Sequence, residues 1–173
     1  PRPEDRMYLR DKALLELMYA TGCRASEAGD LKMADLHNDL GVVKITGKGN
    51  RQRLVPIGRH AAEAIEQYLQ ELRPRLVKEA RPTDRLLLSE RGTPMNRFTV
   101  WHTVKKHAAR AGLRDVHPHT IRHTFATHML SGGADLRVVQ ELLGHARVTT
   151  TQIYTHVDQS RLRSIVKKHH PRP

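Results

Sequence analysis

Cysteine and aromatic residues are scarce in this chain, and long apolar runs are missing from it. Cys23 is the only cysteine, so an intrachain disulfide is excluded and a reducing compartment such as the cytoplasm is favoured. Aromatic residues make up 4% of the 173 residues, so a core must be built mostly from Leu, Val, Ile, Ala and Met. No apolar run approaches the ~20 residues of a membrane-spanning helix, and no signal peptide is recognisable. We therefore expect a single domain that has no membrane partner.

Acidic residues are outnumbered by basic ones, and the basic residues are clustered. The chain has 30 Lys and Arg against 18 Asp and Glu, which gives a formal net charge of +12. Residues 44–53 contain four basic and no acidic side chains, and residues 105–173 contain twelve basic and four acidic ones. Clustering of this kind favours a polyanionic partner such as nucleic acid over a uniformly solvated basic surface.

Apolar spacing predicts a mainly α-helical fold with a small antiparallel β-sheet. Residues 42–46 and 53–57 are rich in Val, Ile and Leu and flank a basic, glycine-rich turn, which is typical of a β-hairpin. Residues 86–88, all leucine, are a candidate third strand. Gly22 is expected to end the first helix, so that Arg24 would lie just beyond that end. The helical pattern covers residues 9–20, 60–72, 97–111, 119–131, 135–143 and 158–168.

Six side chains are of the types that phosphoryl transfer needs when no metal takes part. Arginine and histidine can stabilise a doubly charged phosphorane, a lysine can protonate a leaving oxygen, and a tyrosine can attack phosphorus. His119 and Arg122 are spaced i, i+3, which favours one face of a helix. Each residue also has an ordinary alternative, such as a capping histidine, a surface arginine, a simple phosphate contact or a tyrosine in the core. The six candidates are Arg24, Lys48, His119, Arg122, His145 and Tyr154.

Two other kinds of site are not favoured. His119 and His123 have the spacing of a zinc-protease helix, but Thr120 stands where that motif requires glutamate. The turn around Lys48 does not match a nucleotide-binding P-loop, because Gly49 replaces the required serine or threonine. We therefore expect neither a metal nor a nucleotide cofactor.

Seven stretches of sequence, in order, resemble the catalytic domain of the tyrosine site-specific recombinases, the bacterial Xer type in particular. The most specific of them are His119-Thr120-Ile121-Arg122-His123, Leu143-Gly144-His145 and Thr150-Thr151-Gln152-Ile153-Tyr154-Thr155-His156-Val157. The resemblance implies the fold that these enzymes share with type IB topoisomerases. It also implies that the six candidates form the catalytic set, with Lys48 protonating the leaving 5′ oxygen.

The mechanism implied by the resemblance is a pair of transesterifications. Tyr154 would attack a DNA phosphate and form a 3′-phosphotyrosine, and a 5′ hydroxyl from another strand would reverse the step without metal or ATP. The implied partners are double-stranded DNA with a specific recombination site and other protomers, in a tetramer on paired sites. Exchange of the C-terminal helix, whose apolar stripe is Leu162, Ile165 and Val166, would link the protomers. The expected DNA contacts are Lys44, Arg51, Arg53, Arg97 and Lys105.

The chain begins with Pro1 rather than Met. We interpret residues 1–173 as a single catalytic domain, a C-terminal fragment from which the family's N-terminal DNA-clamp domain is absent. Two alternatives stay open at this point: a type IB topoisomerase-like enzyme that relaxes DNA, and a DNA-binding module without catalysis. Chromosome-dimer resolution, plasmid resolution and mobile-element integration all remain open as the biological task.

Overall fold

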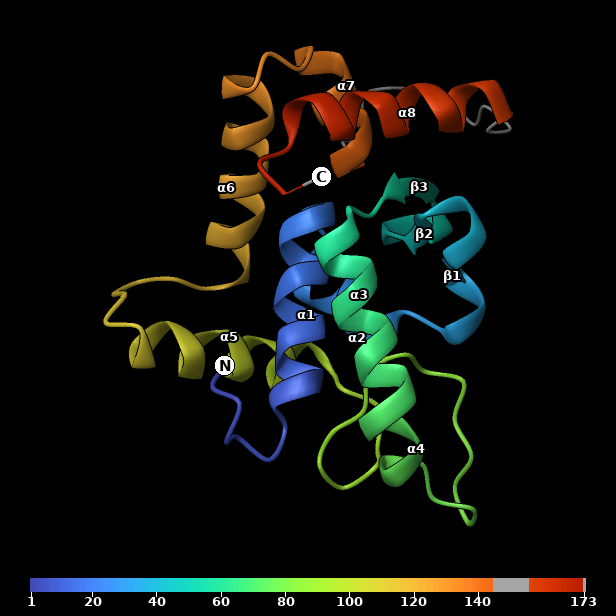
Figure 1. The fold of residues 1–173 in the computed structure, drawn as a ribbon, viewed down its shortest axis with the longest axis vertical. Helices are drawn as coiled ribbons and strands as arrows, with labels where there is room; N and C mark the ends of the chain where they lie inside the picture. The colour runs from blue at the N-terminus through green and yellow to red at the C-terminus, as the bar shows by residue number, and fades with distance from the viewer. Residues whose placement is uncertain (145–155, 173) are drawn as a thin grey trace.

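The structure of the chain is a computed structural model that describes residues 1–144 and 156–172, without the side chains of 156–161. Helices dominate this described part, and a small antiparallel sheet lies beside them, in the strand order β1-β2-β3 (Figure 1). The predicted class, mainly α with a small antiparallel β-sheet, is confirmed. The helices are α1 (Tyr8–Thr21), α2 (Ala25–Asp30), α3 (Arg59–Gln67), α4 (Arg73–Leu76), α5 (Arg97–Arg110), α6 (Pro118–Ser131), α7 (Leu136–Leu143) and α8 (His156–His169). The strands are β1 (Leu36–His37), β2 (Val42–Thr46) and β3 (Gln52–Pro56).

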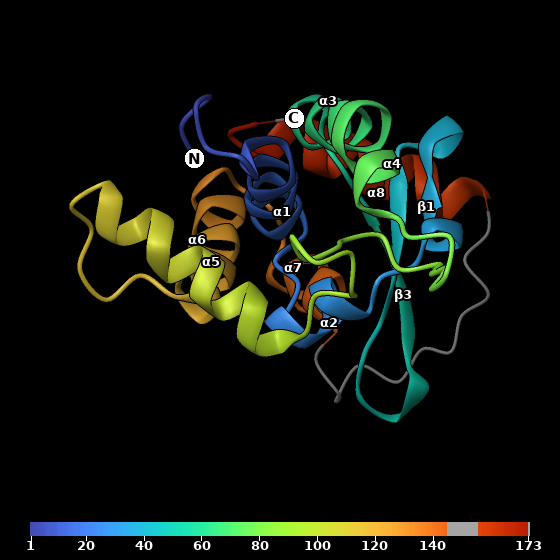
Figure 2. The same cartoon turned by 90° about the horizontal axis from the view of Figure 1, so that it is seen from below.

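Helix α1 runs through the middle of the molecule, where it packs against α3 and α6 (Figures 1 and 2). Its side chains Leu14, Leu17 and Met18 are fully buried. The helix is buried on more than one side, because Ala13, Ala20 and Thr21 are also buried. The packing of α1 therefore fixes the position of its C-terminal end, from which the chain continues to Arg24.

Gly22 ends α1 in the way the sequence predicts. Its φ is 60°, in the left-handed region, and its N–H donates to the Met18 carbonyl at 2.9 Å. A Cβ at this position would lie 2.6 Å from Phe125 Cδ1 and 2.8 Å from Leu143 Cδ2. Glycine is thus required twice, for the backbone turn and for the close approach of α6 and α7. The result is that α1, α6 and α7 meet at one point, immediately before Arg24.

The β2–β3 hairpin is paired from Val42 opposite Pro56 to Thr46 opposite Gln52. Its side chains alternate between the two faces of the sheet, and Val43, Ile45 and Val55 are fully buried. Figure 2 shows the turn of the hairpin extending away from the helices. The hairpin predicted from the sequence is confirmed, and it holds Lys48 at its tip.

The third strand is not the leucine run that the sequence suggests. β1 pairs with β2 instead, whereas Leu86, Leu87 and Leu88 are fully buried outside the sheet. Their backbone groups bond elsewhere: the Leu86 N–H donates to the Leu31 carbonyl at 2.8 Å, and the Leu88 N–H donates to Tyr68 Oη at 3.1 Å. A continuous apolar run has no period, so it signals burial without specifying a strand.

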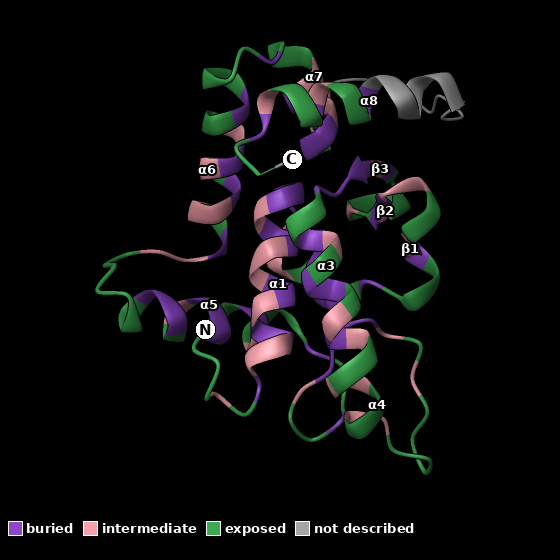
Figure 3. Cartoon of the chain, viewed as in Figure 1, coloured by how far each residue is buried: buried purple, intermediate pink, exposed green. Residues whose placement is uncertain are grey.

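Helix α8 packs on its own chain, against β3 and α6. Leu162 and Val166 are buried and Ile165 is half-buried, as the predicted apolar stripe requires. The carbonyl of His169 lies 2.3 Å from where a Cβ on Gly132 would stand. Buried residues line the facing sides of the helices and the sheet, and one apolar cluster extends from α1 to α8 (Figure 3). Within residues 1–144 and 156–172, no helix is both long and apolar enough to cross a membrane.

Candidate active site

Arg24 occupies the N-cap of α2, where the chain has left α1 but has not yet become helical. Its backbone N–H donates to Glu27 Oε2 at 2.8 Å, and its Nη1 donates to Glu27 Oε1 at 2.9 Å. The Arg24 side chain is 41% exposed, whereas that of Glu27 is 4% exposed. The buried carboxylate therefore holds one side of the guanidinium, while the Arg24 side chain stays partly exposed to solvent.

Glu27 is also held by a second arginine, Arg53 of β3. Arg53 Nη1 and Nη2 donate to the two carboxylate oxygens at 3.1 and 2.9 Å. Burial opposes ionisation of Glu27, but the hydrogen bonds and charge of Arg53, together with the hydrogen bonds of Arg24, outweigh it and lower the pKa of Glu27 to about 2. Glu27 is thus a carboxylate at neutral pH and orients both arginines.

The position of Arg53 corrects its predicted role as a DNA contact. Its side chain is 6% exposed, and its Nε donates to the carbonyl of Leu142 at 2.8 Å. All three guanidinium nitrogens are therefore engaged inside the protein. Strand β3 turns this side chain inwards, away from any DNA on the surface.

Arg122 lies in α6 and reaches the same junction from the other side. Its Nη1 donates to the Gly22 carbonyl and its Nη2 to the Leu143 carbonyl, both at 2.7 Å. Burial, followed by the positive charge of Arg24, lowers the pKa of Arg122 to about 10, so the side chain remains protonated at neutral pH. Two cationic groups from segments about a hundred residues apart thus lie close enough to repel each other, and an anion between them would be stabilised.

Lys48 is exposed in the short turn Lys48–Asn50 at the tip of the hairpin. Gly49 has a φ of 71°, which lets the turn close tightly, and a Cβ there would have open space around it. At the base of the turn, a Cβ on Gly47 would lie 3.2 Å from Glu27 Oε1. The hairpin that carries Lys48 therefore packs directly on the carboxylate that holds Arg24.

His119 is exposed at the start of α6, one turn before the buried Arg122. Its ring lies 6.0 Å from that of His117, with the two planes at 77°. The structure thus brings Arg24, Arg122 and the base of the Lys48 hairpin together and places His119 at the adjoining surface. The remaining two candidates, His145 and Tyr154, lie outside the described residues. In the described part of the chain, no group of three His, Cys, Asp or Glu side chains is arranged to hold a metal.

The other expected DNA contacts are distributed over the hairpin and α5. Lys44 Nζ pairs with Asp35 Oδ1 at 3.1 Å, and Arg51 is exposed near the hairpin tip. On α5, the Arg97 guanidinium lies 4.6 Å from the ring centroid of Phe98, and Lys105 Nζ lies 5.8 Å from that of Trp101.

The two aromatic residues of α5, Phe98 and Trp101, were missed by the sequence reasoning although they are 59% and 42% exposed. Arg97, Trp101 and Lys105 are spaced i, i+4, i+8, which places these three residues on one face of the helix. That spacing is the sequence signal that could have identified Trp101.

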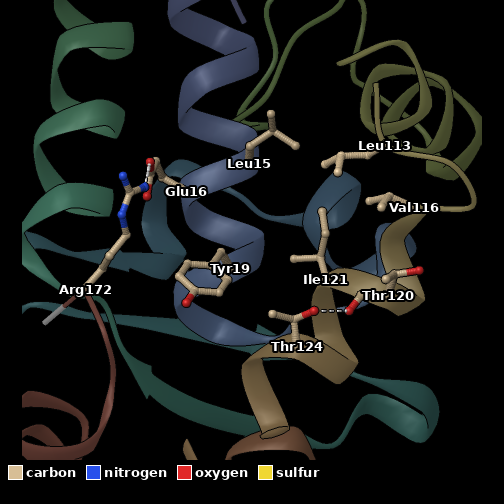
Figure 4. Close-up of a pocket in the computed structure, with 9 residues that line it drawn as sticks. All are labelled: Leu15, Glu16, Tyr19, Leu113, Val116, Thr120, Ile121, Thr124 and Arg172. Carbon is tan, nitrogen blue, oxygen red and sulfur yellow. Dashed lines mark hydrogen bonds and ion pairs between the residues drawn. The ribbon is translucent and has the colours of Figure 1, made fainter. Parts of the chain in front are cut away.

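An apolar groove of about 340 Å³ lies between α1, α6 and the C-terminal segment (Figure 4). Leu15, Tyr19 and Ile121 line it, and Arg172 closes one end through an ion pair with Glu16. None of the four candidate catalytic side chains that the structure describes is among the residues that line it. The groove is therefore separate from the cluster of arginines.

Comparisons with known proteins agree with this geometry. The chain is 49% identical over 171 residues to tyrosine recombinase XerD of Chlorobaculum tepidum, and 52% identical over 165 residues to tyrosine recombinase XerD of Corynebacterium glutamicum. These matches cover 98% and 95% of this chain but 56% and 54% of the two relatives, so the chain spans just over half of their length.

Solved structures show the same fold. The crystal structure of XerA recombinase matches with a TM-score of 0.73 and 33% identity, over 95% of this chain and 60% of the other. XerH site-specific recombinase, bound to difH substrate in a pre-cleavage complex, matches with a TM-score of 0.71 and 31% identity, over 96% of this chain and 48% of the other. Residues 3–161 match the phage integrase family. This chain therefore belongs to the phage integrase family, with the fold of the tyrosine recombinases.

Proposed function

We propose that this chain is the catalytic part of a site-specific DNA recombinase, in which Tyr154 forms a 3′-phosphotyrosine intermediate. The observation that carries the proposal is the convergence of Arg24 and Arg122 at Gly22, beside the hairpin of Lys48. A phosphorane develops two negative charges, and preorganised cationic donors stabilise it more than they stabilise the starting phosphodiester. Each such donor is typically worth about 10²–10³ in rate.

Lys48 is suited to the role of general acid. Its exposed side chain is carried by a turn whose base is fixed against Glu27. A DNA backbone held by Arg24 and Arg122 would place its leaving 5′ oxygen within reach of this flexible side chain. His119, His145 and Tyr154 complete the proposed set, with the histidines as further donors to the phosphate and the tyrosine as nucleophile.

Helix α5 and the hairpin provide the proposed DNA-binding surface. Arg97 and Lys105 supply charge for phosphates, and the exposed rings of Phe98 and Trp101 supply apolar contact beside them. Lys44 and Arg51 extend the basic surface towards Lys48. The net charge of +12 favours association with DNA from a distance and makes its affinity sensitive to salt.

We further propose that residues 1–173 form one catalytic domain that acts in the cytoplasm. The single apolar cluster from α1 to α8 supports the first point, and the lone, buried Cys23 supports the second. We also propose that protomers assemble as a tetramer on paired sites by exchanging the C-terminal helix. The docking of α8 on its own chain would then be the arrangement before assembly.

Two other functions are less well supported. A type IB topoisomerase-like enzyme would use the same arginines and lysine. The two relatives that are 49% and 52% identical to this chain, however, are named as recombinases. A DNA-binding module without catalysis would not need a buried carboxylate to orient Arg24 at a site shared with Arg122.

The test begins with recovery of the target site. The intact protein is incubated with fragmented genomic DNA of its host, denatured, and the DNA that stays covalently bound is sequenced. We expect one short sequence to be enriched, and peptide mapping to place the linkage on Tyr154. Tyr154→Phe should abolish the linkage while changing DNA affinity less than about twofold, since only the attacking oxygen is lost.

The matched control is Tyr8→Phe, which removes a hydroxyl elsewhere and should keep the linkage. A linkage mapped to Tyr8, Tyr19 or Tyr68 would contradict the assignment of Tyr154. Strand exchange between two copies of the recovered site would separate a recombinase from a topoisomerase, which would only relax supercoiled DNA.

A further inference from the structure

Arg53 makes three directed contacts in a buried place where three segments of the chain meet. Its two terminal nitrogens hold both oxygens of Glu27, at 3.1 and 2.9 Å, and its Nε holds the Leu142 carbonyl at 2.8 Å. The side chain begins on β3, the carboxylate belongs to α2, and the carbonyl belongs to the last turn of α7. Arg53 thus bonds at once to the carboxylate that holds Arg24 and to the end of α7.

The end of α7 needs such a partner. The last carbonyls of a helix have no N–H donor within it and must accept hydrogen bonds from outside. Arg53 donates to the Leu142 carbonyl and Arg122 donates to the Leu143 carbonyl, so two guanidinium groups cap the last two residues of α7. Gly144 then turns the chain with a φ of 68°, and a Cβ there would lie 3.1 Å from Arg53 Nη1. The point from which the chain continues to His145 is therefore held by Arg53.

The base of the hairpin that carries Lys48 also packs against Glu27. Gly47 precedes Lys48, and its missing Cβ leaves just enough room for Glu27 Oε1, 3.2 Å from the Cβ position. Glu27 is oriented by Arg53 through both of its oxygens. If the Glu27 carboxylate moved, the base of the Lys48 hairpin and the Arg24 guanidinium would both lose the group that they contact.

We propose that Arg53 is a positioning residue for DNA cleavage, which locks the Arg24–Glu27 pair, the base of the Lys48 hairpin and the end of α7 into one arrangement. The inference rests on the proposed recombinase function for its kinetic consequence. Arg53 does not touch DNA, and it acts through Glu27 and through the backbone of α7.

Only arginine has the shape for this task. A planar guanidinium presents a two-pronged face to a carboxylate and a third N–H in another direction, whereas a lysine offers a single point charge. Arg53→Lys should therefore keep the charge opposite Glu27 and lose the simultaneous contact with Leu142. It is a milder change than Arg53→Ala, which would leave the Glu27 carboxylate buried without its main partner.

Arg10→Lys is the matched control. Arg10 is also buried, and it also bonds a carboxylate, that of Asp11, and a carbonyl, that of Leu88. It lies near the start of α1, whereas Arg24 follows the end of that helix. The two variants thus remove the same kind of contact at different distances from the candidate site.

Two measurements test the inference in the intact protein. The first is amide hydrogen exchange without DNA, resolved by peptide. In Arg53→Lys we expect residues 24–28, 47–53 and 136–144 to exchange at least about tenfold faster, with α3 and α4 unchanged. In Arg10→Lys these three segments should exchange as in the parent protein. Uniformly faster exchange throughout the Arg53→Lys protein would instead mean a purely structural role and would overturn the inference.

The second measurement is single-turnover cleavage of a nicked duplex that carries the site recovered by covalent trapping. Arg53→Lys should bind this duplex within about twofold of the parent affinity and cleave it roughly 10²-fold more slowly, the cost of misplacing reacting groups by about 1 Å. Arg10→Lys should cleave within about threefold of the parent. Parent-like exchange and cleavage in Arg53→Lys would refute the role of Arg53. If the parent itself formed no covalent linkage, the proposed function would fail, while the exchange measurement would still decide whether Arg53 couples the three segments.

Discussion

Gly22 and Phe125 approach each other so closely that a Cβ on residue 22 would stand 2.6 Å from the Phe125 ring. Gly22→Ala should therefore force the fully buried ring of Phe125 to move, in addition to straining a left-handed backbone position. Overpacking of a core typically costs about 1–3 kcal/mol. Because Arg24 follows two residues later, we also expect slower DNA cleavage.

Gly112→Ala is the control for this prediction. Gly112 has a φ of 72°, and a Cβ there would meet nothing within 4 Å, so it isolates the backbone strain. Urea unfolding should show that Gly22→Ala lowers the free energy of unfolding by roughly 1–3 kcal/mol more than Gly112→Ala does. Equal losses in the two variants would show that Phe125 adapts without cost.

Lys48→Ala should slow cleavage without weakening DNA binding appreciably, if Lys48 protonates the leaving 5′ oxygen. Loss of a general acid typically costs about 10²–10⁴ in rate. A substrate with sulfur at the 5′ bridging position has a better leaving group and should restore the rate of the variant close to that of the parent. Failure of the sulfur substrate to do so would reduce Lys48 to a phosphate contact.

Glu27→Gln should alter how stability depends on pH. The lowered pKa of Glu27, about 2 in the fold against an ordinary value of 4.5, means that the carboxylate stabilises the fold above pH 4.5. That contribution, about 3 kcal/mol at neutral pH by linkage, is lost as the pH falls from 4.5 towards 2. The variant should therefore be less stable than the parent at pH 7, and the difference should shrink as the pH falls below 4.5.

Urea unfolding at pH 7 and pH 3 measures this change. Glu63→Gln is the control, because Glu63 is exposed and its ion pair with Arg59 at 3.7 Å is a surface pair. It should change the free energy of unfolding by less than about 1 kcal/mol at either pH. A gap of the same size at pH 7 and pH 3 between parent and Glu27→Gln would contradict the pKa assigned to Glu27.

Arg97→Ala should weaken DNA binding if α5 lies on the DNA. Removing one phosphate contact should reduce the slope of log affinity against log salt concentration by about 1. Arg75→Ala, an exposed arginine on α4, is the control and should leave both affinity and slope unchanged. Identical slopes for the parent and for Arg97→Ala would place DNA elsewhere on the surface.

Most of the fold could be predicted from apolar spacing and glycine. The helix predicted over residues 9–20 is α1, whose end Gly22 marks, and the hairpin over 42–57 is β2 and β3, two apolar runs separated by a glycine-rich turn. The leucine run at 86–88 was misassigned because burial on all sides leaves no period to distinguish a strand. The two-residue strand β1 gave no signal at all, since its pairing with β2 is settled by packing rather than by its own residues.

The sequence nominates the candidate site as a set of residue types but does not give their arrangement. Arg24 and Arg122 were expected together, and their convergence at Gly22 supports that expectation. Arg53 was assigned to the surface because the hairpin is basic, yet it shares a face of β3 with the buried Val55, two residues further on. Strand alternation alone would have pointed it inwards. The partnership of Arg53 with Glu27 joins residues 26 positions apart, which no local pattern reveals.

Arg122 has a structural role that cannot be separated by mutation from its proposed catalytic role. The same guanidinium that is proposed to hold the phosphate also ties the Gly22 carbonyl to the Leu143 carbonyl. Under the proposed function, a variant at this position would lose a phosphate donor and a link between two backbone segments at the same time. A loss of cleavage in an Arg122 variant would therefore not by itself identify the arginine as a phosphate donor.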